Sequence, residues 1–223
     1  MAEPQVWGPK RSAGYDDRVR RLFPGYEAMH ARVVAELRAR AEPGARVLVI
    51  GAGTGYEAVE LARAGYHVVA VDPSEDMLTV ARERAAGAPN LEFFRGRLEE
   101  LPHRKRFDAA LCLLVMHFLP DDGAKAALLA EARSRCSQAA ALLLADLVGE
   151  PGTAGFEAAF EAWMTRLATV STPEELGRDR ERILADVHFI SEARELELLR
   201  SNGWSNPAVM WRNEMMALFG AVG

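Results

Sequence analysis

The sequence is poor in cysteine and has no apolar run long enough to cross a membrane. Its 223 residues include two cysteines, Cys112 inside an apolar run and Cys136 near the expected end of a helix. Two cysteines so placed match neither a metal-site spacing nor a disulfide framework, so we expect both to be packing residues. Residues 1–12 are polar and lack the apolar region of a secretion signal. We therefore expect a cytoplasmic protein that does not bind membranes.

The sequence also lacks an excess of positive charge. It has 27 lysines and arginines against 32 aspartates and glutamates, a formal net charge of -5. An acidic chain has no overall attraction for nucleic acid, which favours a small-molecule substrate over RNA. One basic cluster is the exception, and because three glutamates are interleaved with it we expect a solvated surface of mixed charge there: Arg95, Arg97, Arg104, Lys105 and Arg106.

What the sequence does contain is a regular alternation of strand and helix patterns. The run at 46–50 is apolar and β-branched at nearly every position, as in a strand buried on both faces of a parallel sheet. The alternation predicts an α/β fold with a doubly wound, seven-stranded, mostly parallel sheet. The expected strands are 46–50, 67–71, 91–94, 107–113 and 139–146, the helices between them are 55–64, 75–86 and 121–135, and the runs 207–212 and 215–220 form a terminal hairpin.

Helical segments are added to this core before and after it. From Tyr15 onward apolar residues recur at helical spacing with a break at Pro24-Gly25, which predicts two helices. Residues 153–188 also have a helical pattern, and a last helix ends at Gly203. We expect a single domain over 1–223. Its parts are an N-terminal helical lid at 13–42, a cofactor-binding core at 43–148, a helical insertion at 149–190, and a final helix with the β-hairpin at 191–223.

The glycines that follow the first strand predict a ligand site. Gly51, Gly53 and Gly55 are spaced two apart between a buried strand and a helix, where the chain turns sharply and its backbone N–H groups point at a ligand. Asp72 ends the next strand, and a carboxylate there can accept hydrogen bonds from the two hydroxyls of a ribose. The dinucleotide fingerprint requires glycine at the sixth position, which here is Tyr56.

These stretches together resemble the class I S-adenosylmethionine-dependent methyltransferases, from about Tyr15 to the C-terminus. The resemblance implies that the cofactor is S-adenosyl-L-methionine (SAM) and that its product is S-adenosyl-L-homocysteine (SAH). We expect no metal site. The stretches that carry it are Val47-Leu48-Val49-Ile50-Gly51-Ala52-Gly53-Thr54-Gly55, Val71-Asp72-Pro73-Ser74, Gly96-Arg97-Leu98-Glu99-Glu100-Leu101-Pro102, Phe107-Asp108-Ala109-Ala110-Leu111 and Val115-Met116-His117-Phe118-Leu119.

The resemblance also implies roles for single residues. The three glycines would pass close to the methionine part of the cofactor, and Asp72 would hold the ribose. Two positions depart from the family: Val49 replaces an acidic residue, and Arg97 replaces an aspartate that would accept a hydrogen bond from the adenine amino group. Further cofactor contacts are implied for Tyr15 at the cofactor carboxylate, for Pro73, Ser74, Met77, Arg97 and Leu98 around the adenosine, and for Leu113 and Leu114 beside the transferred methyl.

A looser resemblance points to a subgroup. Phe23-Pro24-Gly25-Tyr26 and Leu218-Phe219-Gly220 are similar to the tRNA uridine-34 carboxymethyltransferase-like enzymes. This implies either a relative that uses carboxy-S-adenosyl-L-methionine or a small-molecule methyltransferase of the same ancestry. An RNA-modifying enzyme, a nicotinamide-dependent oxidoreductase and a cofactor-binding protein without turnover are the alternatives. A homodimer is compatible with each of them.

Two residues are candidates for acid–base chemistry. His117 follows the fourth strand and Asp146 ends the fifth, at the carboxyl edge where the cleft of an open α/β sheet lies. Imidazole titrates in the range useful for a general base, and the carboxylate could orient a substrate amine or hydroxyl. The alternatives are a structural histidine and a cap for the insertion. Trp163 is expected in the core of the insertion rather than in a pocket wall, and His188 on the surface.

Overall fold

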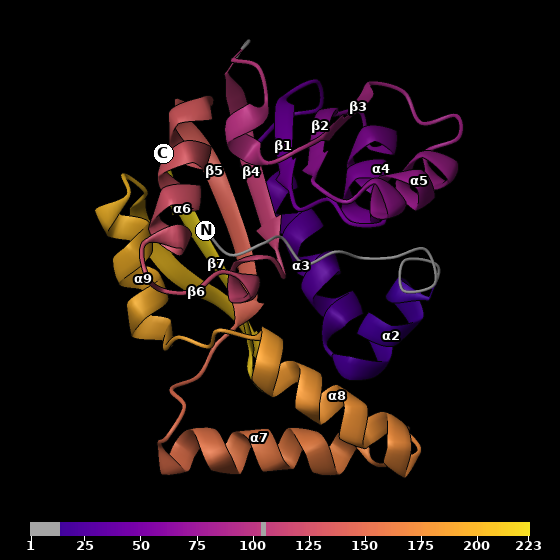
Figure 1. Ribbon diagram of the computed structural model, residues 1–223. Helices are drawn as coiled ribbons and strands as arrows, with labels where there is room; N and C mark the ends of the chain where they lie inside the picture. Colours follow the sequence, from indigo (N-terminus) through magenta and orange to yellow (C-terminus); the bar gives the residue numbers. More distant parts are fainter. Residues whose placement is uncertain (1–13, 104–105) are drawn as a thin grey trace.

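The computed structural model describes residues 14–103 and 106–223, and in it the strands form one seven-stranded sheet. The order is β3-β2-β1-β4-β5-β7-β6, with β7 antiparallel to β5 and β6 and the other pairs parallel (Figure 1). This confirms the expected fold. The strands are β1 (Arg46–Ile50), β2 (His67–Asp72), β3 (Leu91–Arg95), β4 (Phe107–Leu113), β5 (Cys136–Leu147), β6 (Ser205–Asn213) and β7 (Met216–Val222).

Helices cover both faces of the sheet because successive side chains of each strand point to opposite faces. Val47 and Val49 pack with one set of helices, whereas Leu48 and Ile50 pack with the other. The first set is α3 (Tyr26–Arg38), α4 (Tyr56–Arg63) and α5 (Glu75–Arg84). The second is the short 3₁₀ helix η1 (Leu98–Glu100), α6 (Ala124–Arg135) and α9 (Glu192–Ser201). Cys112 and Cys136 are both buried and free, as expected.

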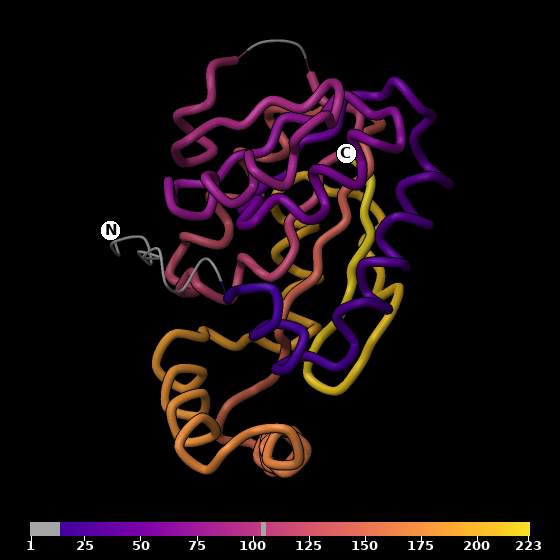
Figure 2. The backbone as a smooth tube through the Cα atoms, turned by 90° about the vertical axis from the view of Figure 1, so that its right-hand side faces the viewer, coloured from indigo at the N-terminus to yellow at the C-terminus, as the bar shows by residue number. Residues whose placement is uncertain are grey.

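The remaining helices lie at the carboxyl end of the parallel strands. They are α2 (Tyr15–Leu22), the 3₁₀ helix η2 (Met116–Phe118), α7 (Ala154–Leu167) and α8 (Pro173–Asp186). In both views α7 and α8 form one end of the molecule, with α2 beside α8 (Figures 1 and 2). Trp163 is buried and its indole N–H donates to the Leu22 carbonyl at 2.9 Å, so the insertion is fastened to the N-terminal helices. Among the described residues no helix is long and apolar enough to span a membrane.

The fifth strand begins earlier than the sequence indicated. We expected it from residue 139, because Ser137 and Gln138 interrupt the apolar run, but β5 follows α6 at Cys136 without a loop. Cys136 pairs with Phe107, and its carbonyl accepts a hydrogen bond from the Arg106 guanidinium at 2.8 Å. These tertiary contacts satisfy the backbone there, and a shift of register between Phe107 and Ala109 accommodates the polar residues.

Candidate functional site

The three glycines of the β1–α4 loop all adopt the left-handed conformation, but their surroundings differ. Their φ values are 67° at Gly51, 52° at Gly53 and 75° at Gly55. A Cβ on Gly51 would collide with Val115, and one on Gly55 would lie 2.8 Å from the Cβ of Ala81. A Cβ on Gly53 would meet nothing within 4 Å. Packing within the protein therefore requires glycine at two of the positions, and Gly53 is the position that faces open space.

Asp72 lies next to this open glycine. It is the last residue of β2, and its Oδ2 accepts the Gly53 N–H while its Oδ1 accepts the Ser74 N–H, each at 2.8 Å. Burial raises the pKa of the carboxyl, and the two backbone donors partly oppose that shift. A carboxylate has about four acceptor positions, so two remain after these bonds. The side chain is thus turned toward the glycine loop and can accept two further hydrogen bonds.

The residues expected around an adenosine lie along the same edge of the sheet. Ser74 caps α5, because its hydroxyl accepts the Met77 N–H at 3.3 Å. Met77 and Leu98 are buried, whereas Pro73 is exposed. The Arg97 N–H donates to the Glu100 carboxylate at 2.6 Å. The Arg97 side chain extends to the surface, where it lies 4.0 Å from Glu99.

The first helix is fastened to the glycine loop. The Thr54 hydroxyl donates to Asp16 at 2.6 Å, and Asp16 also pairs with Arg84 of α5. Tyr15 is partly buried beside them, and burial together with the nearby carboxylates Glu57 and Asp72 raises the pKa of its hydroxyl. The structure therefore brings Tyr15 into the electrostatic neighbourhood of Asp72, although the two are far apart in sequence.

A small cavity lies where α2, η2 and α8 meet the ends of β4 and β5. Its volume is about 70 Å³, roughly half of the ~150 Å³ apolar cavity that holds benzene in another protein. It brings together three of the predicted residues, Tyr15, Leu114 and His117. Leu114 has φ of +56°, an unusual conformation for a leucine, and its N–H donates to the Ala145 carbonyl at 2.7 Å. Leu113, just before it, is partly buried at the end of β4.

His117, which lines this cavity, forms a buried pair with Asp146. The imidazole Nδ1 is hydrogen-bonded to Oδ1 of Asp146, and the same oxygen accepts the Leu147 N–H at 2.8 Å. Both side chains are buried. The His117 carbonyl accepts the His188 N–H at 2.7 Å, while the His188 side chain is exposed as expected. The sequence placed the two residues at the same edge, and the bond between them is a finding of the structure.

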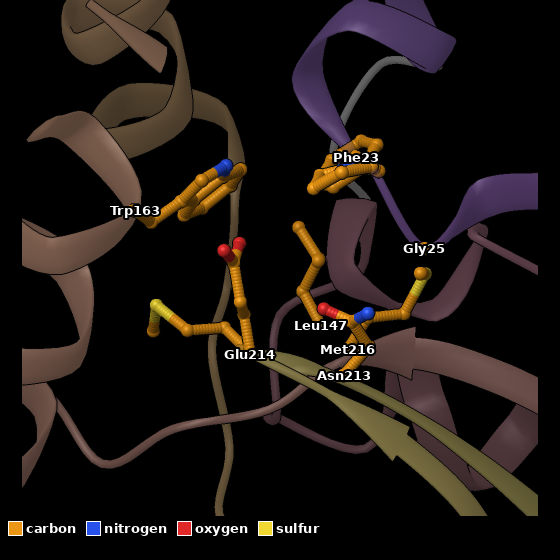
Figure 3. Close-up of a pocket in the computed structure, with 9 residues that line it drawn as sticks. Phe23, Gly25, Leu147, Trp163, Asn213, Glu214 and Met216 are labelled. Carbon is orange, nitrogen blue, oxygen red and sulfur yellow. The ribbon is translucent and has the colours of Figure 1, made fainter. Parts of the chain in front are cut away.

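A second crevice, drawn in Figure 3, is filled by packing. It encloses about 10 Å³, room for roughly one water molecule. Phe23 and Trp163 face each other across it, with ring centroids 5.4 Å apart. A Cβ on Gly25 would lie 2.8 Å from both Asn213 and Trp211 of the terminal hairpin. The Phe23-Pro24-Gly25 stretch thus fits closely against the hairpin, and Trp163 belongs to the core as expected.

In the described residues, the basic cluster noted in the sequence lies among acidic side chains and backbone carbonyls. Arg95 lies 3.8 Å from Glu75, and Arg106 donates to backbone carbonyls. Arg104 and Lys105 lie outside the described residues, as do residues 1–13, which include the polar stretch 1–12 and the first position of the expected lid.

Sequence reasoning missed three buried charged residues near the site. The carboxylate of Asp179 in α8 forms ion pairs with the guanidinium groups of Arg18 and Arg21, with N–O distances of 3.2 and 2.6 Å. Lys125 and Glu195 are buried between α6, α9 and the sheet. Their spacing was a signal that could have been used, because Lys125 lies four residues before the buried Leu129, and Glu195 three before Leu198, on the inward faces of their helices.

The chain is similar to known methyltransferases along this part of the fold. Residues 47–138 match the family described as a methyltransferase domain. A demethylmenaquinone methyltransferase of Clavibacter sepedonicus is 48% identical over 59 residues, 26% of this chain and 24% of the relative. A ubiquinone biosynthesis O-methyltransferase of Hahella chejuensis is 35% identical over 82 residues, 35% of this chain and 34% of the relative.

A solved structure shares the fold over nearly the whole chain. The magnesium protoporphyrin IX methyltransferase of Synechocystis PCC 6803 with bound SAH superposes with a TM-score of 0.67 at 21% identity, covering 95% of each chain. By contrast, this chain spans about a quarter to a half of the length of the curated relatives that it matches in sequence.

Proposed function

We propose that this chain, which belongs to the class I S-adenosylmethionine-dependent methyltransferases, transfers the methyl group of SAM to a nucleophilic atom of a small molecule. The observation that carries the proposal is the open backbone at Gly53 beside the buried carboxylate of Asp72. The curated relatives are named for quinone biosynthesis and the solved structure for a magnesium protoporphyrin, which supports a small-molecule acceptor.

The residues present fit an adenosyl cofactor. Gly53 offers main chain without a side chain over it, and Asp72 keeps two acceptor positions for a pair of ribose hydroxyls. Ser74, Met77 and Leu98 would contact the adenosine, and Tyr15 would close over the carboxylate end. When bound, SAM supplies a methyl group on a positively charged sulfur, which makes the transfer a displacement that depends mainly on alignment.

His117 and Asp146 would act on the acceptor. Asp146 accepts only, so it fixes the neutral imidazole with its proton on Nδ1, and Nε2 is the ring nitrogen left for the cavity that His117 lines. In that position His117 would take the proton of an acceptor hydroxyl or amine as the methyl is transferred. Leu113 and Leu114 would form the apolar wall beside the methyl group.

The small volume of the cavity means that a substrate enters only when α2 and α8 move apart. The cavity of about 70 Å³ holds too little space for an aromatic ring. Helices that close over a reaction site exclude water from it, and the opening step then controls substrate entry. We propose that the N-terminal helices and the insertion act as this lid.

The carboxymethyltransferase-like alternative predicts a different cofactor preference. Carboxy-S-adenosyl-L-methionine carries one more negative charge at the sulfur end, so it would require a cationic partner near Leu113 and Leu114. Arg18 lines the cavity there and pairs with Asp179. Calorimetry on wild type and on Arg18→Met, with SAM and with its carboxylated form, distinguishes the two cofactors. We expect wild type to bind SAM at least as tightly as carboxy-S-adenosyl-L-methionine.

The function is tested by ligand binding and by transfer. We expect SAH, and not NAD, to raise the melting temperature, since a ligand that binds the folded state stabilises it. Asp72→Asn should remove most of that shift, and Asp17→Asn, at an exposed position of α2, should leave it unchanged. Transfer of labelled methyl from SAM to a panel of phenols, catechols and carboxylic acids then identifies the acceptor class. Equal shifts with NAD and SAH would refute the proposal.

A further inference from the structure

A second group of buried ionisable side chains surrounds the His117–Asp146 pair. Glu195, in the first turn of α9, has no solvent exposure, and neither of its carboxyl oxygens has a hydrogen-bond partner among the described residues. Lys125, near the start of α6, is also buried, and its ammonium donates to the Met116 carbonyl at 2.6 Å. Asp146 and Lys125 both act electrostatically on Glu195, so these residues form one cluster.

Hydrogen bonding decides which of the two buried carboxyls carries the charge. Asp146 accepts the Leu147 N–H and is hydrogen-bonded to the His117 ring, whereas neither oxygen of Glu195 has a hydrogen-bond partner among the described residues. Two neighbouring carboxyls in a buried site do not both ionise readily, so the one without donors retains its proton. Burial, with Asp146 as the next cause, raises the pKa of Glu195 to about 8. The Glu195 carboxyl is therefore protonated at neutral pH.

The charge state of Asp146 fixes the tautomer of His117. A carboxylate only accepts hydrogen bonds, so the Nδ1 that faces it must carry the proton, and Nε2 keeps its lone pair. A protonated Asp146 could donate to Nδ1 and reverse this arrangement. Lys125 acts on the same ring by a second route, because Met116, whose carbonyl it binds, precedes His117 in η2.

We infer that Lys125 and Glu195 are positioning residues for the His117–Asp146 pair. Lys125 anchors the turn that carries His117, while Glu195 holds its proton and so leaves the hydrogen bond between Asp146 and His117 undisturbed. The inference rests on the proposed function for its catalytic meaning, but the arrangement of protons exists in the protein without substrate. The other groups that act on Glu195 are Asp121 and Arg194, which pair with each other at 2.8 Å. Cys112 of β4 stays a thiol, because burial raises its pKa.

The test is nuclear magnetic resonance of ¹⁵N-labelled histidine in the ligand-free protein. In wild type we expect His117 to be the Nδ1–H tautomer at pH 7, with a second change of its ring shifts near pH 8 as Glu195 ionises. In Lys125→Met the turn that carries His117 loses its anchor, so the ring shifts of His117 should move toward those in Asp146→Asn. Glu195→Gln should leave the ring unchanged at pH 7 and abolish the alkaline step. His30, which lies 3.2 Å from Glu57, is the internal control.

Two results would overturn the inference. One is a Lys125→Met protein whose His117 keeps the wild-type ring shifts while Asp146→Asn changes them. The other is a Glu195→Gln protein whose His117 is already altered at pH 7. If Lys125→Met does not fold, the inference is decided by the change of the His117 ring shifts near pH 8 in wild type and by its loss in Glu195→Gln. SAH binding is measured separately, so a protein that fails to bind SAH contradicts the proposed function without changing the result for His117.

Discussion

The Thr54 hydroxyl donates a hydrogen bond to the Asp16 carboxylate, with 2.6 Å between the oxygens. Thr54 lies between the open glycine and the start of α4, and Asp16 lies in the first turn of α2. This bond joins the proposed lid directly to the loop that would bind the cofactor. We therefore expect the position of α2 to depend on the conformation of the loop.

The first prediction concerns this link. Thr54→Val removes the donor while keeping the shape of the side chain, so we expect a loss of about 1 kcal/mol in the free energy of unfolding. Amide exchange of residues 15–22 should become faster, while exchange in β1 and β4 stays slow. Thr79→Val is the matched control, because that hydroxyl bonds only within α5. Unchanged exchange in α2 would show that the bond does not hold the lid.

Substitutions at two glycines of the β1–α4 loop separate the role of the loop in ligand binding from its role in packing. Gly53→Ala should cost about 1–2 kcal/mol of stability from the left-handed backbone alone, and should weaken SAH binding more than tenfold. Gly55→Ala adds a collision with Ala81, so its stability should fall by about 1–3 kcal/mol more than that of Gly53→Ala. Urea unfolding and calorimetry with SAH measure the two effects. Tight SAH binding by Gly53→Ala would remove this residue from the site.

Asp179 is expected to hold the lid to the insertion. Its carboxylate is buried between Arg18 and Arg21, so Asp179→Asn should cost about 2 kcal/mol and speed amide exchange in both α2 and α8. Glu161→Gln breaks an exposed pair with Arg180 inside the insertion and should change neither quantity measurably. If Asp179→Asn affected α8 alone, the carboxylate would be part of the insertion and not a fastening of the lid.

The raised pKa of Glu195 predicts how the free energy of unfolding depends on pH. Its pKa is raised from 4.5 to about 8 in the folded protein. Between these values the unfolded chain releases a proton that the folded protein retains, so the contribution of Glu195 to stability falls as pH rises and is constant above about pH 8. The free energy of unfolding of Glu195→Gln, relative to that of wild type, should be most favourable at alkaline pH and least favourable below pH 4.5. Urea unfolding from pH 5 to 9 measures the difference, and parallel curves would contradict the prediction.

The sequence predicted the elements whose patterns are local. The buried run of β1 and the sharp turn at the glycines after it both depend on neighbouring residues, and the structure confirms them. The early start of β5 could not be predicted, because Cys136 joins the sheet through its pairing with Phe107 and its bond to Arg106. The sequence likewise gave no reason to distinguish Gly53 from its two neighbours, since Val115 and Ala81 approach the loop from other elements.

By itself, then, the sequence determined the order of strands and helices, the left-handed loop and the carboxylate at the end of β2, because backbone conformation is set by residues within a few positions of one another. Only the tertiary structure decided which ionisable residues lie close enough to form hydrogen bonds or ion pairs or to change one another's pKa. Asp146 meets His117, Glu195 comes near Lys125, and Asp179 meets Arg18 because strand order and helix packing bring distant segments together. Burial and the donors of those distant segments set the energy of a buried charge, and no local pattern contains that information.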